Sequence, residues 1–399
     1  MVKNKPVYAF EEADSKNRML LGGKGAGLSE MTRLKLPVPP GFTITTEGCN
    51  NYYDNGKKLP KAVMPLVMKN IVKMEKKTGK KWNSTKNPLL VSVRSGAAIS
   101  MPGMMDTILN LGLNEKTVEG FAQQTKNPRF SWDSYRRFIQ LLGKVVFGVN
   151  DEKFDHVLDS AKKKQGVKDD SKLNVESLKK IVAEYKKICE KHTKRKFPDT
   201  PNEQLGLAIE AVFKSWMGER AIVYREKNNI TKDIANGTAV NVVTMVFGNM
   251  GDDSATGVVF TRNGSNGKKE MEGEYLINAQ GEDVVAGVRT GKNIDLLKKE
   301  MPRSHKELSN ACIKLEKHFS EPQDIEFTIE QGKFYLLQTR TAKMTAAALV
   351  KTSVDMVKEK LINKDKALTR IPAQQLEALL HRTMAVSYTH LTLPTTPYV

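Results

Sequence analysis

The feature that most constrains the fold is a block of helix-only sequence inside a chain that otherwise mixes strand and helix patterns. Between residues 112 and 199, apolar residues recur at helical spacing and strand-like alternation is almost absent. Short β-branched or alternating segments stand on both sides, such as residues 89–93 and 239–247. We therefore expect an α+β protein whose sheet-bearing part is interrupted by a helical insertion.

Composition places the chain among globular proteins. Of its 399 residues, 39% are hydrophobic and 27% charged, and no apolar run is long enough to span a bilayer. The N-terminus lacks the apolar segment of a secretory signal. Cys49, Cys189 and Cys312 lie far apart and suit neither a disulfide framework nor a metal site. These observations predict a cytoplasmic protein that binds no membrane.

The net charge of +19 raises the question of a nucleic-acid partner. Residues 57–81 hold nine lysines and one acidic residue, Glu75, but no nucleic-acid-binding motif accompanies them. We therefore expect solvated helix faces and no nucleic-acid ligand. The alternative is a basic DNA- or RNA-binding module, and a basic surface also attracts small anions.

A glycine-rich run covers residues 21–28, Leu-Gly-Gly-Lys-Gly-Ala-Gly-Leu. Four glycines directly before a predicted helix let backbone N–H groups approach an anion at the helix N-terminus, and Lys24 adds a mobile positive charge. The run matches neither the P-loop nor the dinucleotide-binding pattern. We expect Gly23, Lys24 and Gly25 to bind an anion; the alternative is a plain glycine turn with a solvated lysine.

Arg94 stands at the end of a predicted buried strand and opens a long loop that ends at Thr107. Binding residues gather on loops at strand ends, and an arginine there can hold phosphate oxygens through two parallel hydrogen bonds. Met105 and the neighbouring methionines suit an adaptable apolar lid, with core packing as the alternative.

Residues 324–340 read as a β-hairpin with a predicted three-residue loop, Glu-Gln-Gly. This register pairs Ile329 with Lys333 and therefore places two sets of side chains on opposite faces. The polar set is Asp324, Glu326, Gln338 and Arg340, and the core-facing set is Ile325, Phe327, Ile329, Tyr335 and Leu337. Two carboxylates beside an amide and an arginine can hold Mg²⁺ between nucleotide phosphates. The alternative is an edge hairpin with a wet polar face.

Two further segments suit the nucleoside part of a ligand. The strand at 241–248 can present its backbone to an adenine edge while Met245 packs on the ring, although the same letters describe many central strands. In the acidic loop at 280–289, packing explains Glu282 and Arg289 poorly.

Together these motifs resemble the ATP-grasp nucleotide-binding domain of the pyruvate, phosphate dikinase family. Five stretches carry the resemblance: residues 21–28, 92–114, 134–139, 276–290 and 324–340. Phosphoenolpyruvate synthases share the Gly-Gly-Lys-Gly run, but the segment 100–106, Ser-Met-Pro-Gly-Met-Met-Asp, favours the phosphate-using dikinases.

The resemblance implies that the chain binds ATP with Mg²⁺ and donates a phosphoryl group. The implied phosphate-gripping residues are Lys24, Arg94 and Arg340. The implied metal ligands are Asp324 and Glu326. The other implied nucleotide contacts are Gly23, Gly25, Met105, Thr107, Arg137, Met245, Glu282 and Gln338.

The resemblance also implies phosphate, a swivelling phosphohistidine domain and a pyruvate-binding barrel as partners, and it is compatible with a homo-oligomer. None of the six histidines stands in the family's Thr-Ser-His context, so we expect an N-terminal fragment. Two departures from the family pattern are Val243, where glutamine is usual, and Gly264, where proline is usual. The first puts one polar contact near the base in doubt. A nucleotide-binding module without turnover stays an alternative.

The motifs and composition shifts predict a division of the chain. The predicted parts are a first ATP-grasp lobe at 1–111 continued at 200–245, a helical insertion at 112–199, a second lobe at 246–341, a helical linker at 342–385, and a non-native tail at 386–399.

Overall fold

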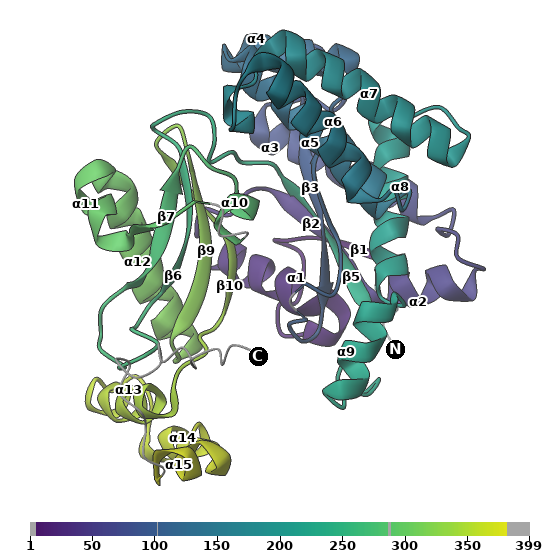
Figure 1. Cartoon of the computed structure of the whole chain (residues 1–399). Coiled ribbons are helices and arrows are strands. Elements are labelled where there is room, and N and C mark those ends of the chain that lie inside the picture. The colour runs from purple at the N-terminus through teal and green to yellow at the C-terminus, as the bar shows by residue number, and fades with distance from the viewer. Residues whose placement is uncertain (1–4, 102, 286–288, 381–399) are drawn as a thin grey trace, which may run out of the picture. The chain divides into compact units, whose positions relative to one another are not determined.

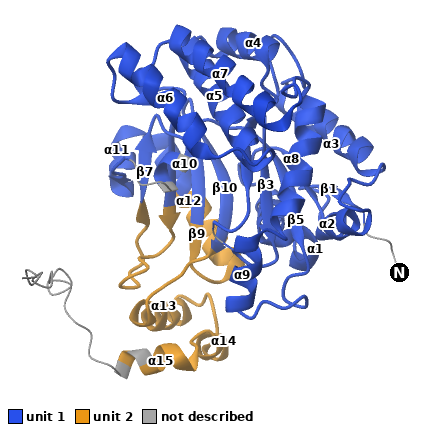
Figure 2. Ribbon diagram, turned by 45° about the vertical axis from the view of Figure 1, so that its right-hand side comes forward, with its two compact units in different colours: residues 1–258, 274–308, 325–340 blue, residues 259–273, 309–324, 341–399 orange. Residues whose placement is uncertain are grey.

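The computed structural model describes residues 5–101, 103–285 and 289–380, and its mixture of helices and sheets confirms the α+β class (Figure 1). The predicted tail at 386–399 lies outside the described residues. The chain divides into two compact units (Figure 2). Unit 1 comprises residues 1–258, 274–308 and 325–340, and unit 2 comprises residues 259–273, 309–324 and 341–399.

The first sheet, in unit 1, has five strands in the order β1-β2-β5-β3-β4, and its neighbouring strands pair antiparallel. Its strands are β1 Val7–Ala9, β2 Gly41–Ile44, β3 Val91–Ala97, β4 Thr107–Leu111 and β5 Thr238–Thr244. Central strand β5 is buried along its whole length, which explains its run of β-branched residues.

Five helices of unit 1 accompany this sheet: α1 Arg18–Arg33, α2 Thr46–Asp54, α3 Val63–Thr78, α8 Pro201–Ser215 and α9 Glu219–Lys227. Helix α1 packs on β3 and β5, and α8 packs on β3, β4 and β5. Helices α8 and α9 are separate because the chain is extended at Gly218, the residue before α9.

Between β4 and α8 the described chain is helical, as the sequence pattern indicates. The helices are α4 Glu115–Thr125, α5 Pro128–Val145, α6 Asp151–Gln165 and α7 Val175–Thr193, with the short 3-10 turn η1 Asp170–Lys172. Each α-helix begins after an asparagine whose side chain accepts a first-turn N–H, namely Asn114, Asn127, Asn150 and Asn174. The predicted apolar faces of α5 and α7 pack against each other.

The second sheet has the strand order β10-β9-β6-β7-β8. Its strands are β6 Ala255–Phe260, β7 Glu272–Ile277, β8 Lys292–Asn293, β9 Gln323–Glu330 and β10 Lys333–Thr341. The helices in this stretch are α10 Gly281–Val285, η2 Ile294–Leu296, α11 Leu297–Glu300 and α12 Pro302–Phe319. The boundaries between the two units fall inside β6, β7, α12, β9 and β10.

Unit 2 contains the last described helices, α13 Ala346–Lys358, α14 Lys364–Thr369 and α15 Ala373–Leu380. At its centre is Arg262, which is fully buried. Its guanidinium Nη2 lies 2.7 Å from Glu316 Oε1 and 2.8 Å from Glu359 Oε2. Lys269 also pairs with Glu359, so four charged residues of unit 2 form one network.

Candidate functional site

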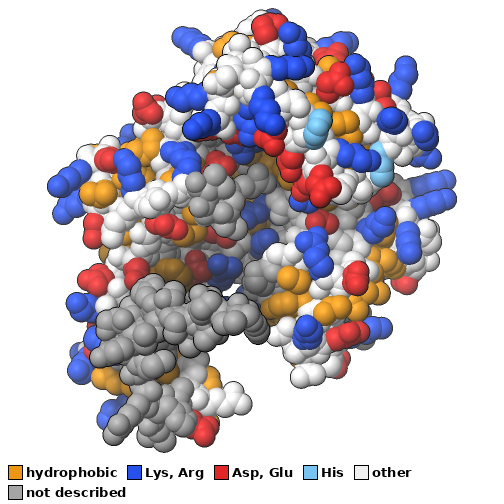
Figure 3. All heavy atoms as spheres, in the orientation of Figure 1, with side chains coloured by type: hydrophobic (Ala, Val, Ile, Leu, Met, Phe, Trp, Pro, Cys, Tyr) orange, Lys and Arg blue, Asp and Glu red, His pale blue; other side chains and the backbone are white. Residues whose placement is uncertain are grey.

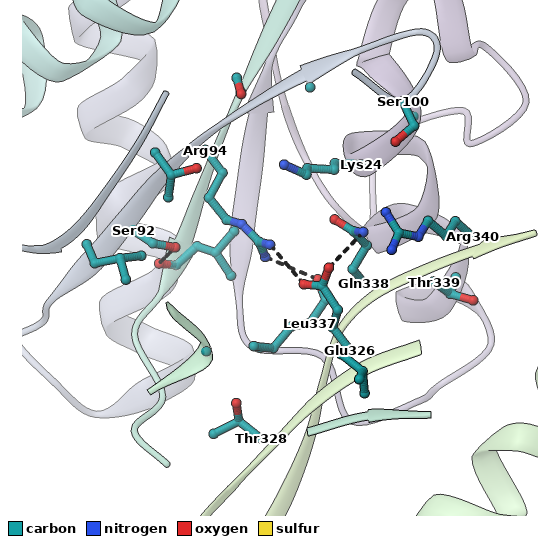
Figure 4. A pocket seen from close by; sticks show the side chains of 18 of the residues that line it. Lys24, Ser92, Arg94, Ser100, Glu326, Thr328, Leu337, Gln338, Thr339 and Arg340 are labelled. Atoms are coloured by element: carbon teal, nitrogen blue, oxygen red, sulfur yellow. Dashed lines mark hydrogen bonds and ion pairs between the residues drawn. The ribbon is translucent and has the colours of Figure 1, made fainter. Parts of the chain in front are cut away.

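Five separate stretches of the sequence line one cavity of about 760 Å³, and all of its lining residues belong to unit 1. The lining residues lie within 18–24 of α1, within 92–109 around β3 and β4, within 243–258 from β5 to β6, within 280–284 at α10, and within 326–340 of hairpin β9–β10. The cationic and polar part of the wall includes Lys24, Arg94, Glu326, Gln338 and Arg340 (Figure 4). The apolar part includes Met101, Met105, Leu109, Val243, Met245, Val258 and Val284.

The glycine run lies inside helix α1, so the prediction that the helix begins after the run is wrong. Gly22 breaks the helix with φ 67° and ψ 165°. A Cβ on Gly22 would lie 1.9 Å from the carbonyl oxygen of Gly96, and one on Gly25 would lie 2.8 Å from Asn241 Oδ1 and Thr43 Oγ1. The glycines therefore let α1 approach the sheet closely, a packing role that the glycine spacing alone does not indicate.

The break at Gly22 nevertheless produces a usable helix start. The helix resumes at Gly23, and both Gly23 and Lys24 line the cavity. First-turn amides of a helix have no partner within that helix. The arrangement can therefore present backbone N–H groups to an anion, as the sequence predicts. Gly25 is not among the lining residues, because it faces the sheet.

Lys24 supplies a cation that the rest of the described protein does not neutralise directly. Its amine has no hydrogen bond or ion pair within the part of the chain that the structure describes. Burial, together with the neighbouring Arg94 and Arg340 cations, lowers the pKa of Lys24 to about 8, and Glu326 opposes the shift. Below about pH 8 an anion in the cavity would therefore meet a charged lysine, and above that pH its binding would favour protonation of the amine.

Arg94 reaches the cavity from β3, where it lies between Thr107 of β4 and Asn241 of β5. Its guanidinium donates to Glu326 Oε2 at 3.2 Å and to the Leu337 carbonyl oxygen at 3.4 Å. The side chain is 17% exposed. Thr107 also lines the cavity, as does Met105 of the predicted lid.

The methionines in the loop after Arg94 serve in both predicted roles, as cavity lining and as core. Met101 is buried in the main core of unit 1 and also lines the cavity. Met104 and Met105 are partly buried and pack against the same core. These residues therefore form part of the cavity wall and part of the core.

Hairpin β9–β10 turns over two residues, so the predicted three-residue loop is wrong. Strand β9 ends at Glu330 and β10 begins at Lys333. The turn residues Gln331 and Gly332 have φ of 47° and 72°, as a tight hairpin turn requires. A two-residue turn sets Glu330, and not Ile329, opposite Lys333.

The shorter turn moves the side chains of β10 by one position. Phe334 and Leu336 are buried, whereas the predicted core residues Tyr335 and Leu337 are only half-buried. A one-residue change of register exchanges the two faces of a strand, which accounts for the burial of Phe334 and Leu336 near the turn. Further along β10 the exchange does not hold, because Gln338 meets Glu326 as predicted, and Leu337, Gln338, Thr339 and Arg340 all line the cavity.

Glu326 and Gln338 meet in the cavity, as the sequence predicts. Gln338 Nε2 donates to Glu326 Oε1 at 3.0 Å, and Arg94 holds the other carboxylate oxygen (Figure 4). Gln338 is only 8% exposed. Its Oε1 has no hydrogen-bond partner among the described residues, so a buried acceptor is left for a ligand.

These residues fit a sparsely held magnesium ion. Glu326 and Gln338 Oε1 supply oxygen donors, which Mg²⁺ prefers. Among the described residues there is no group of three or more His, Cys, Asp or Glu that could hold a metal ion. Such a site suits Mg²⁺ that takes its remaining ligands from water and from the oxygens of a bound phosphate.

Several predicted residues are not among those that line the cavity. Asp324 is buried and belongs to unit 2. Glu282 lies in α10, and its side chain is outside the described part of the structure. Arg137 contacts three carboxylates of unit 1: Asp133 at 3.3 Å, Asp170 at 3.8 Å and Asp283 at 3.4 Å.

The sequence reasoning missed Arg18 and Gln280, both of which line the cavity. Arg18 stands at the start of α1, just before the glycine run, so its charge was a usable signal. Gln280 belongs to the acidic loop that drew attention to Glu282 and Arg289. The structure explains Arg289 through backbone contacts, because its guanidinium donates to the carbonyl oxygens of Ile277 and Asn278.

A cavity with converging cations, an acceptor amide and an apolar wall defines a site for a phosphorylated ligand. The chain matches the family described as pyruvate phosphate dikinase, AMP/ATP-binding domain, over residues 18–65, 56–309 and 302–361. It therefore belongs to that family.

Individual relatives agree with the family match. The chain is 53% identical over 384 residues to pyruvate, phosphate dikinase of Entamoeba histolytica, and the match covers 96% of this chain and 43% of the relative. It is 52% identical over 378 residues to the enzyme of Clostridium symbiosum, with 94% and 43% covered. The Rhizobium meliloti enzyme is 48% identical over 394 residues, with 95% and 44% covered. The chain thus spans less than half the length of these relatives.

Three remaining sequence features have a structural counterpart. The three cysteines are free and buried. No helix among the described residues is long and apolar enough to cross a membrane.

On the face shown in Figure 3, lysine and arginine side chains are interspersed with acidic ones. In the lysine-rich stretch, Lys73, Lys77 and Lys81 pair with Glu12, Glu11 and Glu75.

Proposed function

We propose that the chain binds Mg·ATP in the cavity of unit 1 and donates a phosphoryl group from it. The observation that carries this proposal is the convergence of Lys24, Arg94 and Arg340 around Glu326 and Gln338 (Figure 4). Three cations beside one carboxylate suit a highly charged anion, and the apolar wall suits a purine base. The arrangement supports an ATP-grasp type of nucleotide-binding domain.

In this proposal each polar residue has a distinct task. Arg94 and Arg340 hold phosphate oxygens, and their fixed planar donors orient the transferring group. Lys24 places its positive charge against the triphosphate and stabilises the charge that develops there. Glu326 and Gln338 Oε1 hold Mg²⁺, which when bound neutralises phosphate charge. Gly23 contributes backbone N–H groups, and Met105, Thr107 and Met245 contact the nucleotide.

The activity we propose for the longer enzyme follows the relatives named pyruvate, phosphate dikinase. ATP, phosphate and pyruvate are converted to AMP, diphosphate and phosphoenolpyruvate, through a phosphohistidine on another domain and a pyruvate-binding barrel. The ATP-grasp lobes at 1–111 with 200–245 and at 246–341, the insertion at 112–199 and the linker at 342–385 remain part of this proposal. The same holds for the nucleotide roles of Gly25, Arg137 and Glu282 and for Asp324 as a metal ligand.

Titration calorimetry with Mg·ATP tests the proposal. The wild-type chain should bind Mg·ATP, and removing Mg²⁺ with a chelator should weaken binding. The surface variant Lys61→Ala, in the lysine-rich stretch, serves as the control and should bind as the wild type does. A folded sample that binds no Mg·ATP would refute the proposal.

A second experiment separates phosphoryl donation from simple binding. The chain is incubated with β-labelled ATP and a separately produced phosphohistidine domain from a relative. Label should reach that domain's histidine slowly, because tethering normally provides a high effective concentration. Tight binding without transfer would favour a nucleotide-binding module without turnover.

A further inference from the structure

Gln280 has the character of a ligand-binding residue. Its side chain is only 5% exposed and lines the cavity. Within the part of the chain that the structure describes, neither Oε1 nor Nε2 has a hydrogen-bond partner. A buried amide with both polar atoms unpaired is unfavourable in an empty protein, so a ligand that satisfies both atoms is the natural explanation.

The backbone around Gln280 is held in place. Its N–H donates to Asp283 Oδ2 at 2.8 Å, and Asp283 Oδ1 accepts from Arg137 at 3.4 Å. The N–H of Ala279 donates to the Gly248 carbonyl oxygen at 2.9 Å. Gln280 is therefore anchored next to the segment that follows β5 and is prepared for a ligand before the ligand arrives.

The lining residues around this anchor are apolar or uncharged. Gly248, whose carbonyl oxygen accepts from Ala279, lines the cavity, as do Met245 and Val246 just before it in the chain. Val284 of α10 also lines the cavity. The phosphate-binding candidates Lys24, Arg94 and Arg340 belong to other elements. The Gln280 amide therefore belongs to the part of the cavity that suits the uncharged portion of a nucleotide.

We propose that Gln280 recognises the base edge of adenine, an inference that rests on the proposed binding of ATP. An amide presents one donor and one acceptor side by side. Adenine offers the complementary pair, the 6-amino donor beside a ring-nitrogen acceptor, and Asn and Gln recognise adenine in this way in other complexes. Gln280 is thus a specificity-determining residue that selects the base and takes no part in the phosphate chemistry.

Gln204 provides a matched control. It is also fully buried, but its amide is satisfied by the protein. Its Oε1 accepts from the Gly112 N–H at 3.2 Å, and its Nε2 donates to the carbonyl oxygens of Leu113 and Pro198, each at 3.0 Å. Replacing Gln204 removes a buried amide without touching the cavity.

The test compares three nucleotides by titration calorimetry: ATP, purine riboside triphosphate, which lacks the 6-amino group, and 2′-deoxyATP. The proteins are the wild type, Gln280→Met, Gln280→Leu and Gln204→Met. The wild type should prefer ATP over the purine analogue by about 10- to 100-fold. Both Gln280 variants should lose this preference while keeping the wild-type ratio between ATP and 2′-deoxyATP.

Thermal unfolding of the nucleotide-free proteins supplies an independent readout. Gln280→Met should keep or raise the midpoint, because it removes an unpaired buried amide, whereas Gln204→Met should lower it. A fall for both Gln280 variants as large as that for Gln204→Met would contradict the inference.

Binding data separate failure of the inference from failure of the proposed function. A wild type that binds no ATP refutes the proposed function itself. A wild type that binds ATP, with an unchanged base preference in the Gln280 variants, overturns only the role of Gln280. A lost preference for the 2′-hydroxyl instead would assign the amide to the ribose and also overturn base recognition.

Discussion

Lys24 experiences opposite demands from folding and from binding. Its pKa is about 8 in the folded chain against an ordinary value of 10.5. Below pH 8 the amine is charged in both the folded and the unfolded chain, so the full penalty of burying the charge is present. Between pH 8 and 10.5 the unfolded chain binds more protons, so stability rises with pH over that window.

Replacing Lys24 with Met should therefore stabilise the nucleotide-free protein and weaken nucleotide binding. We expect the free energy of unfolding at pH 7 to rise by about 1–3 kcal/mol, with the gain vanishing as the pH approaches 10.5. Denaturant unfolding at several pH values measures this effect. Lys61→Met, at an exposed position, should change neither quantity. Destabilisation by Lys24→Met beside an unchanged Lys61→Met would show instead that Lys24 supports the fold.

The same shift predicts that ATP binding depends on pH. Because the triphosphate favours the charged amine, binding above pH 8 should take up a proton and the affinity should fall as pH rises. Calorimetry in buffers of different ionisation enthalpy measures the proton uptake directly. Lys24→Met should show no such uptake, and a pH-independent affinity between pH 7 and 9.5 in the wild type would contradict the prediction.

Arg94 and Arg340 should each contribute more than a surface arginine. Replacing either with Ala removes charged hydrogen bonds at the ligand, which costs about 1.5–3 kcal/mol or roughly 10- to 150-fold in affinity for Mg·ATP. Arg303→Ala is the control, because its side chain is 86% exposed and, among the residues that the structure describes, pairs only with Glu307. An exposed pair contributes about 0–1 kcal/mol. Calorimetry that ranks Arg303→Ala with the cavity variants would argue against the site.

At the scale of the element, α1 connects glycine packing to the position of Lys24. The close approach at Gly22 and Gly25 determines how α1 lies on the sheet. Lys24 stands between these two glycines, and a Cβ on Gly96 of β3 would lie 3.4 Å from the Lys24 Cβ. The close approach of α1 to β3 that the glycines allow therefore also determines where the cation enters the cavity.

Gly22→Ala should disturb this element strongly. The positive φ and the 1.9 Å approach to the Gly96 carbonyl oxygen should together cost about 2–4 kcal/mol of stability. Thermal and denaturant unfolding check the value, and nucleotide binding should weaken because Lys24 shifts. Gly206→Ala is the matched control: an added Cβ in α8 meets nothing within 4 Å, so it should stabilise by about 0.5–1 kcal/mol.

At the scale of the whole molecule, the two units depend on different interactions. Unit 1 contains the extended apolar core that joins the first sheet and helices α4–α8. Unit 2 contains the buried network around Arg262. Burial raises the pKa of Glu359, but hydrogen bonds from Arg262 and Lys269 outweigh burial and hold the pKa below its ordinary value of 4.5. The stabilisation from Glu359 is therefore complete above pH 4.5 and is lost as the pH falls through the lowered pKa.

Arg262→Met should destabilise unit 2 by about 3–5 kcal/mol, because it leaves Glu316 and Glu359 without their buried cation. Hydrogen exchange of backbone amides in α13 should accelerate. Lys269→Met removes the 62% exposed member of the network and should cost no more than about 1 kcal/mol. Equal effects of the two variants would contradict a central role for Arg262.

The local pattern of the sequence was sufficient for the class of fold and for much of the cavity wall. Alternation and helical spacing depend on which face of an element is buried, so they identified most strands, the helical block and its apolar faces. Lys24, Arg94, Glu326, Gln338 and Arg340 were recognisable because each is a charged or polar residue in a segment that packing explains poorly. Their family motifs pointed to the same ligand chemistry.

Other properties depended on contacts between distant segments. The length of the β9–β10 turn decided which side of β10 is buried, and the close approach of α1 to β3 decided the role of the glycines. No local pattern distinguishes Gln280, whose unpaired amide is visible only when its partners are counted, from Gln204, whose amide is fully bonded. The amino-acid sequence by itself determined which elements form and which chemical groups they carry, because those depend on neighbouring residues. Only the tertiary structure decided which groups meet and which stay unpaired, because burial and partnership are set by residues far apart in the chain.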